Sequence, residues 1–205
     1  KPARYLGGEQ NEIIKDWTAV SCRFLFAFPD VYEVGMSHLG LQILYGAVNR
    51  EADLLMERTF APWTDMEAVL RQEQIPLFSL ESGHAANAFD CLGFTLQHEM
   101  SYTNVLNMLN LGGIPLFAAQ RGNEDILVIA GGPCASNVEP LAPFFDLVLL
   151  GEGEELLPLL LRKIGQHKSE HQGKMDKPAL LRELARLQGI YVPSLYEPQY
   201  SSDGK

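Results

Sequence analysis

Short apolar runs alternate with helical patterns along most of this chain, and that alternation constrains the fold more than any other feature. The apolar runs lie at residues 22–30, 52–61, 89–97, 126–132 and 145–154. Most are continuous, without the polar residue at every second position that marks a strand with one face in water. Helical spacing follows at residues 38–51, 66–74, 101–113 and 154–166. The sequence therefore predicts an α/β fold with a Rossmann-like, doubly wound, mainly parallel sheet of about five strands.

The composition limits the partners of this chain. Its 205 residues are 46% hydrophobic, which is enough for one substantial core. Acidic residues outnumber basic ones by 26 to 16, and no basic stripe could neutralise nucleic-acid phosphates, so nucleic-acid binding is not expected. No stretch reaches the roughly 18 apolar residues of a membrane span. The start, KPARYLGGEQ, lacks the apolar core of a signal peptide, so we expect a cytoplasmic location and no membrane contact.

The cysteines exclude one kind of metal site. Cys22, Cys91 and Cys134 are far apart in the sequence and form no CxxC pair. An iron–sulfur cluster or structural zinc site built from neighbouring cysteines is therefore excluded. Cys22 and Cys91 begin apolar runs, where a small buried thiol is expected. Cys134 instead follows a glycine pair in a predicted loop.

Glycines follow the last two apolar runs, in GGPCASN (131–137) and GEGEE (151–155). In an open parallel sheet, ligands bind outside the carboxyl ends of the strands, where glycine lets a ligand or a backbone approach closely. A glycine can also simply end a strand, so both interpretations stand for each single loop. We expect a side chain at Gly132 to block the crevice at modest cost to the fold.

A dinucleotide site is the main competing interpretation, and the sequence disfavours it. Such a site needs GxGxxG between the first strand and the first helix, where this chain has only Gly35 and Gly40. The GEGEE loop comes late, and its three glutamates would repel a pyrophosphate. The phosphate-binding pattern GxxxxGK[ST] does not occur.

Five stretches form a recognisable set: FPDVYEVGMSHLGLQILY, FAPW…DME, SLES, SYTNVLNML and IAGGPCASNVEPLAPFFDLVLLGEGEE. Together they resemble the N-terminal domain of an uncharacterised family of radical SAM proteins with a cobalamin-binding-type domain. The resemblance is strong over residues 1–165, and its most specific part is the pattern GGP…P…D…GEGE. It implies a domain that precedes a radical SAM barrel. In that family the barrel carries CxxxCxxC for a 4Fe–4S cluster that cleaves S-adenosylmethionine, and this chain lacks the motif.

The resemblance implies a cobalamin site at the strand ends. Cobalamin domains of the methionine-synthase type carry DxHxxG after the first strand, where the His is the lower cobalt ligand, then a Ser/Thr motif and a glycine pair. Asp30, Tyr32 and Gly35 have the first spacing, with Tyr in place of the His, so ligation by a His at this position is not expected. The candidate cofactor-binding residues are Asp30, Tyr32, Gly35, Ser37, His38, Thr95, Gln97, Gly131, Gly132, Pro133, Gly151 and Gly153, with no catalytic residue and no metal ligand among them.

The chain divides into three predicted parts. Residues 1–21 are a turn-prone arm, and residues 22–165 are the cobalamin-binding-like Rossmann domain. Residues 166–205 are a linker, a helix and the start of the radical SAM barrel. We expect residues 165–177 to be exposed and the tail after Gly189 to pack poorly.

Two functions are compatible with this organisation. The first is a cobalamin-binding module of a radical SAM enzyme, non-catalytic on its own, with the barrel as its partner. The alternative is a degenerate domain that has lost the corrinoid and serves to dock a partner or position a substrate. Room for a corrin beside Tyr32, Thr95 and Gly131 favours the first, and bulky filling there favours the second.

We predict that the isolated chain assembles no iron–sulfur cluster and does not cleave S-adenosylmethionine, because three scattered cysteines cannot supply the thiolates that a cluster needs. Anaerobic reconstitution followed by iron and sulfide analysis tests this prediction. Stoichiometric iron together with reductive cleavage activity would contradict it.

Overall fold

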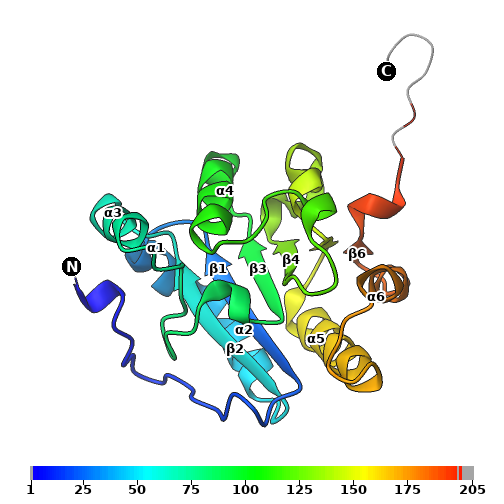
Figure 1. Ribbon diagram of the computed structural model, residues 1–205, viewed down its shortest axis with the longest axis horizontal. Helices are drawn as coiled ribbons and strands as arrows, with labels where there is room; N and C mark the ends of the chain where they lie inside the picture. The colour runs from blue at the N-terminus through cyan, green and yellow to red at the C-terminus, as the bar shows by residue number, and fades with distance from the viewer. Residues whose placement is uncertain (1, 198, 200–205) are drawn as a thin grey trace.

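The apolar runs form one six-stranded sheet, as the computed structural model, which describes residues 2–197 and 199, shows (Figure 1). The strands are β1 (Cys22–Phe28), β2 (Leu54–Phe60), β3 (Cys91–Thr95), β4 (Leu127–Gly131), β5 (Leu147–Leu149) and β6 (Ile190–Tyr191). Their order is β2-β1-β3-β4-β5-β6, with the first five parallel and β6 antiparallel to β5. The predicted doubly wound α/β fold is confirmed, with a short sixth strand added.

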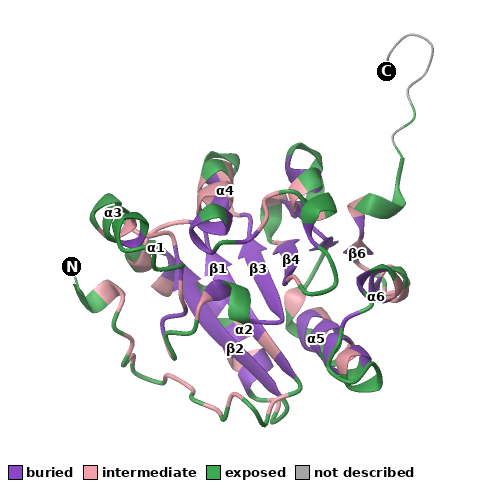
Figure 2. Cartoon of the chain, in the orientation of Figure 1, coloured by how far each residue is buried: buried purple, intermediate pink, exposed green. Residues whose placement is uncertain are grey.

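Helices cover both faces of the sheet (Figures 1 and 2). The α-helices are α1 (Tyr32–Met36), α2 (Leu39–Asn49), α3 (Thr64–Gln72), α4 (Tyr102–Leu111), α5 (Gly153–Glu170) and α6 (Lys177–Leu184). The short 3-10 helices are η1 (Pro2–Arg4), η2 (Ala86–Ala88), η3 (Glu99–Ser101), η4 (Ala118–Gln120), η5 (Pro133–Asn137), η6 (Glu139–Phe144) and η7 (Pro193–Leu195). Helices α2, α5 and α6 pack on one face, and α3, α4 and η5–η6 pack on the other.

Strand β1 shows why continuous apolar runs are required. Its alternate residues Phe24 and Phe26 face the core beneath α2 and α5, while Leu25 and Ala27 face the core beneath α4. Successive strand side chains point to opposite faces, so a strand with two covered faces needs an apolar residue at nearly every position. Each fully buried Leu or Phe contributes about 1.5–3 kcal/mol relative to its exposed state.

The strand order places a switch point between β1 and β3. Strand β1 has β2 on one side and β3 on the other, so the connections that leave β1 and β3 run in opposite directions across the sheet. In open sheets of this order, the diverging loops leave a crevice outside the carboxyl ends of these strands. The fold therefore predicts a ligand site at this edge.

Strand β2 lies at one edge of the sheet, yet all of its residues are buried. The segment 77–82 covers it. Within that segment, the Leu80 amide donates to the Arg58 carbonyl over 2.7 Å, and the Phe78 carbonyl accepts from the Thr59 hydroxyl over 2.9 Å. The Arg58 guanidinium also pairs with Glu81 at 2.6 Å, with both side chains buried. A loop thus takes the place of a further strand.

Ring contacts of Trp17 and several hydrogen bonds hold the N-terminal arm on the body. The Ile13 amide donates to the Tyr45 hydroxyl over 2.9 Å, and Lys15 Nζ donates to the Leu54 carbonyl over 2.6 Å. Trp17 stacks on His84 with ring centroids 3.8 Å apart and meets the Phe89 ring edge-on at 4.8 Å. The Arg23 guanidinium lies 5.1 Å from the Trp17 ring.

The C-terminal part is better packed than its sequence predicts. The segment 165–177 is not a simple exposed linker, because α5 continues to Glu170 and therefore runs across the predicted boundary. His167 is buried, and its Nε2 accepts a hydrogen bond from the Asp176 amide over 3.2 Å. Residues 169–174 are exposed, as expected.

The expectation for the tail is also wrong over its first residues. Ile190 and Tyr191 form β6, and Ile190 and Val192 are buried in the core beneath α5 and α6. Pairing with β5 joins this segment to the sheet, and the Ile190 amide donates to the Leu187 carbonyl over 3.2 Å. A two-residue strand of this kind depends on its neighbour and has too little pattern of its own to be visible in the sequence.

A buried cluster of charges joins β5 to the C-terminal part. Asp146 precedes β5 and accepts from Arg121 Nε over 3.1 Å and from the Val128 amide over 2.8 Å. The Lys177 ammonium, at the start of α6, lies 2.7 Å from the same carboxylate. The side chains of Arg121, Asp146 and Lys177 are 0%, 1% and 7% exposed. Removal of the single anion would leave two buried cations unpaired.

We predict that Asp146→Asn lowers the free energy of unfolding by about 3–5 kcal/mol, the cost of breaking a buried ion pair from one side. Urea denaturation followed by circular dichroism measures it. The matched control is Glu183→Gln, which breaks the exposed pair with Lys163 and should cost less than about 1 kcal/mol. Equal effects of the two substitutions would show that the cluster does not stabilise the fold.

Candidate functional site

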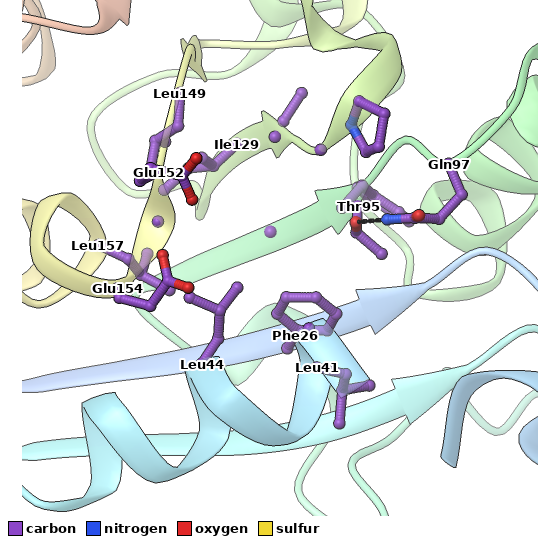
Figure 3. A pocket seen from close by; sticks show the side chains of 18 of the residues that line it. Phe26, Leu41, Leu44, Thr95, Gln97, Ile129, Leu149, Glu152, Glu154 and Leu157 are labelled. Atoms are coloured by element: carbon purple, nitrogen blue, oxygen red, sulfur yellow. Dashed lines mark hydrogen bonds between the residues drawn. The ribbon is translucent and has the colours of Figure 1, made fainter. Parts of the chain in front are cut away.

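A cavity of about 300 Å³ lies between the sheet and helices α2 and α5, beside the carboxyl ends of β3 and β4 (Figure 3). Eight of the predicted site residues line it: His38, Thr95, Gln97, Gly131, Gly132, Pro133, Gly151 and Gly153. They come from the loops after β1, β3, β4 and β5, which the strand order brings to one edge. The cavity therefore lies where the switch point between β1 and β3 predicts a ligand site.

Two glycines of the sheet, Gly93 and Gly131, line the cavity. A Cβ added to Gly93 in β3 would lie 2.3 Å from the Phe24 ring, so this ring from β1 can lie against β3 only because position 93 is glycine. Gly131, at the end of β4, offers more space, since a Cβ there would come no closer than 3.8 Å to its nearest neighbour, Leu149. Leu44 from α2 and Leu149 from β5 lie on opposite sides of the cavity (Figure 3). The walls are mainly apolar.

One wall of the cavity is polar. Gln97 Nε2 donates to Thr95 Oγ1 over 2.6 Å, and Gln97 Oε1 lies 3.2 Å from His38 Nε2. His38 is the N-cap of α2, and its Nδ1 accepts from the Leu41 amide over 3.2 Å. A Cβ on Gly40 would lie 2.9 Å from the His38 ring, so this glycine makes room for the ring. Three side chains from two loops thus form one hydrogen-bonded row.

The rim of the cavity is acidic. Glu152 and Glu154, at the start of α5, line it with exposed side chains (Figure 3). Glu154 and Glu155 lie in the first turn of α5, where a negative charge interacts favourably with the helix dipole. Among the described residues, no lysine or arginine lines the cavity. A ligand with several phosphates would therefore meet carboxylates without a neutralising cation.

The structure does not bring Asp30, Tyr32, Gly35 and Ser37 to the cavity. The Tyr32 hydroxyl donates to Glu9 over 2.5 Å, and its ring packs edge-on against Phe60. Burial, together with the Glu9 hydrogen bond, raises the pKa of Tyr32 to about 12, so the phenol keeps its proton near neutral pH.

The other three have local structural roles. Asp30 accepts from the Val31 amide, and Ser37 donates to the Val34 carbonyl over 2.9 Å. A Cβ on Gly35 would meet the Phe60 ring at 2.3 Å. The loop after β1 thus has the spacing of a cofactor motif, but its residues 32–36 form the short helix α1. The side chains of the motif do not line the cavity.

The expectation that a side chain at Gly132 would block the crevice at modest cost to the fold is wrong. Its backbone has φ 98° and ψ 178°, a region open essentially to glycine alone. An added Cβ would lie 2.9 Å from the Leu96 amide nitrogen and from Thr95 Oγ1, so it would press into β3 rather than fill the cavity. This glycine serves the fold, and a substitution there would not be cheap.

Sequence reasoning missed part of the site. Gly93 lies inside an apolar strand, and an isolated glycine in a strand indicates a close approach of another group. That pattern could have identified it. Leu44 and Leu149 carry no such indication, because a leucine that lines a cavity and one that fills a core look alike in a sequence.

Metal ligands do not gather in the described part of the chain. No group of three or more His, Cys, Asp and Glu side chains there could hold a metal ion. Cys22 and Cys91 are buried, as expected, and Cys134 is half-buried. Both ring nitrogens of His38 already have partners. None of the described helices is both long and apolar enough to span a membrane.

The strand order and the cavity at its switch edge define a doubly wound α/β domain with a ligand-sized site. Comparison with known families then identifies it further. The family model described as "Radical SAM proteins, N-terminal" matches residues 40–193, and the chain belongs to this family.

Two individual proteins are similar to this chain. An uncharacterized protein of Methanocaldococcus jannaschii is 25% identical over 174 residues, which cover 83% of this chain and 33% of that protein. The chain thus spans about a third of the length of this relative. The structure of the radical S-adenosylmethionine methyltransferase TsrM from Kitasatospora setae, with tryptophan substrate and a SAM analogue bound, aligns with a TM-score of 0.46 and 15% identity. That alignment covers 70% of this chain and 26% of TsrM.

We predict opposite outcomes for the two adjacent glycines. Gly132→Ala forces a side chain into a backbone conformation that costs about 1–3 kcal/mol, in addition to the contact with β3. Gly131→Ala meets only ordinary contacts, and removing a glycine from a strand gains up to about 1 kcal/mol. Thermal unfolding of both variants measures the difference. A Gly132→Ala variant as stable as Gly131→Ala would overturn the role assigned to Gly132.

Proposed function

We propose that this chain is the cobalamin-binding N-terminal module of a radical SAM protein and does no chemistry on its own. The observation that carries the proposal is the apolar cavity at the carboxyl ends of β3 and β4, which ends on the Thr95 hydroxyl. Membership of the family supplies the context of a radical SAM protein.

The size of the cavity limits what it encloses. Pockets for drug-sized ligands measure roughly 300–1,000 Å³, and this one is about 300 Å³. A whole corrinoid exceeds that volume, but one flat appended group, such as the nucleotide base of cobalamin, fits. The residues that would hold such a group are Leu44, Leu149 and Gly131, with Thr95 at the polar wall.

The charges at the rim agree with a corrinoid better than with a polyphosphate. The periphery of a corrinoid carries many amide groups, whose N–H donors suit the carboxylates of Glu152 and Glu154. A dinucleotide would bring a pyrophosphate to the same rim and find no lysine or arginine among the described lining residues. Hydrogen-bond donors on the ligand are therefore favoured.

A bound corrinoid would supply a carrier for a methyl group or a redox partner. The residues of this chain would bind it, orient it and exclude water from its enclosed part. The 4Fe–4S cluster and S-adenosylmethionine belong, in this proposal, to a barrel domain that follows the parts 1–21 and 22–165 and starts within 166–205. That barrel is the proposed partner of this edge.

A second candidate function is docking without a corrinoid. The loops at the same edge expose Leu39, Met100 and Leu150, which are 71%, 89% and 40% exposed. Exposed apolar side chains that follow several strands at one edge of the sheet also suit contact with another protein surface. This alternative applies if the cavity binds no corrinoid.

We predict that the chain binds hydroxocobalamin with an altered absorbance spectrum, and that it binds cobinamide, which lacks the nucleotide, at least tenfold more weakly. Gly131→Val should abolish this difference, because its methyl groups would occupy the cavity from a position with ordinary contacts. Absorbance titration and gel filtration measure the binding.

The matched control is Gly46→Val in α2, where an added Cβ meets nothing within 4 Å. This variant should bind as the unchanged chain does. No binding of hydroxocobalamin would refute the cofactor and leave docking. Equal binding of both corrinoids would refute the placement of the nucleotide base in the cavity.

A further inference from the structure

The row of His38, Gln97 and Thr95 has a direction, and that direction determines what the cavity wall offers to a ligand. It begins at a backbone N–H, whose role is fixed. The Leu41 amide can only donate, so the His38 Nδ1 that receives it over 3.2 Å carries no proton. A neutral imidazole then has its proton on Nε2.

Each later bond follows from the previous one. The protonated Nε2 of His38 donates to Gln97 Oε1 at 3.2 Å, which orients the amide so that its Nε2 faces Thr95. Gln97 Nε2 donates to Thr95 Oγ1 over 2.6 Å. The Thr95 oxygen is therefore an acceptor in this row, and its own hydrogen is directed elsewhere. Among the described residues, none accepts a hydrogen bond from this hydroxyl.

The surroundings hold the row in place. The His38 ring lies 5.2 Å from the Phe28 ring and over Gly40. Thr95 is 7% exposed, and a Cβ on Gly132 would lie 2.9 Å from its Oγ1, so the two residues are in close contact. A buried hydroxyl whose hydrogen has no acceptor costs free energy until a ligand or water supplies one.

We propose that His38 and Gln97 are positioning residues that fix Thr95 as a hydrogen-bond donor into the cavity. The site thereby selects a flat ligand group whose buried end carries an unprotonated acceptor, such as a ring nitrogen or a carbonyl oxygen. A group of the same shape with a C–H at that point leaves the hydroxyl unsatisfied and binds more weakly. This inference rests on the proposed function for the identity of the natural ligand, but the selectivity belongs to the cavity itself.

Two small probes test the selectivity without a corrinoid. 1-Methylbenzimidazole has an unprotonated ring nitrogen, and 1-methylindole has the same shape with a C–H in that place. The chain should bind 1-methylbenzimidazole about threefold to tenfold more tightly, as expected for one hydrogen bond. Titrations followed by NMR, at a pH well above the pKa of the probe, give both dissociation constants. Equal constants, or no binding of either probe, would overturn the proposal.

Variants of Thr95 and His38 distinguish a role of these hydrogen bonds in ligand selectivity from a general loss of structure. Thr95→Val should bring the ratio of the two constants close to one, and Thr95→Ser should keep it. His38→Asn retains a capping oxygen for α2 but is too short to reach Gln97, so it should lower the ratio with little loss of thermal stability. A ratio that survives His38→Asn would remove the positioning role from His38.

A direct measurement of the proton completes the test. Nitrogen-15 NMR of labelled histidine should show His38 with its proton on Nε2. The opposite tautomer would reverse the row and overturn the proposal. If the probes show the expected ratio while hydroxocobalamin does not bind, the selectivity stands and the proposed cofactor falls. If hydroxocobalamin binds while the ratio is one, the proposed cofactor stands and the selectivity is refuted.

Discussion

The candidate site depends on the close approach of the loop after β4 to the end of β3. The Leu96 amide donates to the Gly131 carbonyl over 2.7 Å, and the Leu96 carbonyl accepts from the Cys134 amide over 2.9 Å. Gly132 lies between these bonds, in a conformation that only glycine adopts easily. Because the two strands are joined in this way beyond the regular ladder, Thr95 and Gly131 are held on adjacent walls of the cavity. The other walls come from helices that the strand order places there.

Charge is distributed so that the cations stabilise the fold and the anions surround the site. The chain carries a formal charge of −10, and several of its cations are used in buried pairs. Arg58 pairs with Glu81 beside β2, and Arg121 and Lys177 share Asp146 beside β5. The carboxylates at the start of α5 remain at the cavity rim. The composition alone gave the sign of the net charge, but only the fold shows which charges are available to a ligand.

The sequence was informative where the local pattern is strong and failed where contacts decide. The parallel strands and their helices were predictable from continuous apolar runs that alternate with helical spacing. The family was predictable from short motifs, and the match to the family model confirms it. The position of Tyr32 did not follow, since a motif spacing says nothing about which way a short helix turns its side chains. Gly132 was misjudged for a similar reason: a strand-end glycine shows that space is needed, but not on which side. Strand β6 exists only because β5 offers it a partner.

The covered edge at β2 has a consequence for the molecule in solution. An open edge strand presents unpaired backbone groups that can recruit a strand from another copy and start fibril-like growth. Here the Arg58 carbonyl and amide are bonded by the Leu80 amide and the Glu81 carboxylate, and both backbone groups of Met56 are bonded by the Asn49 side chain. An incoming strand would first have to displace the segment 77–82 and expose the buried Arg58–Glu81 ion pair. The sheet therefore resists the addition of a strand from another copy along this side.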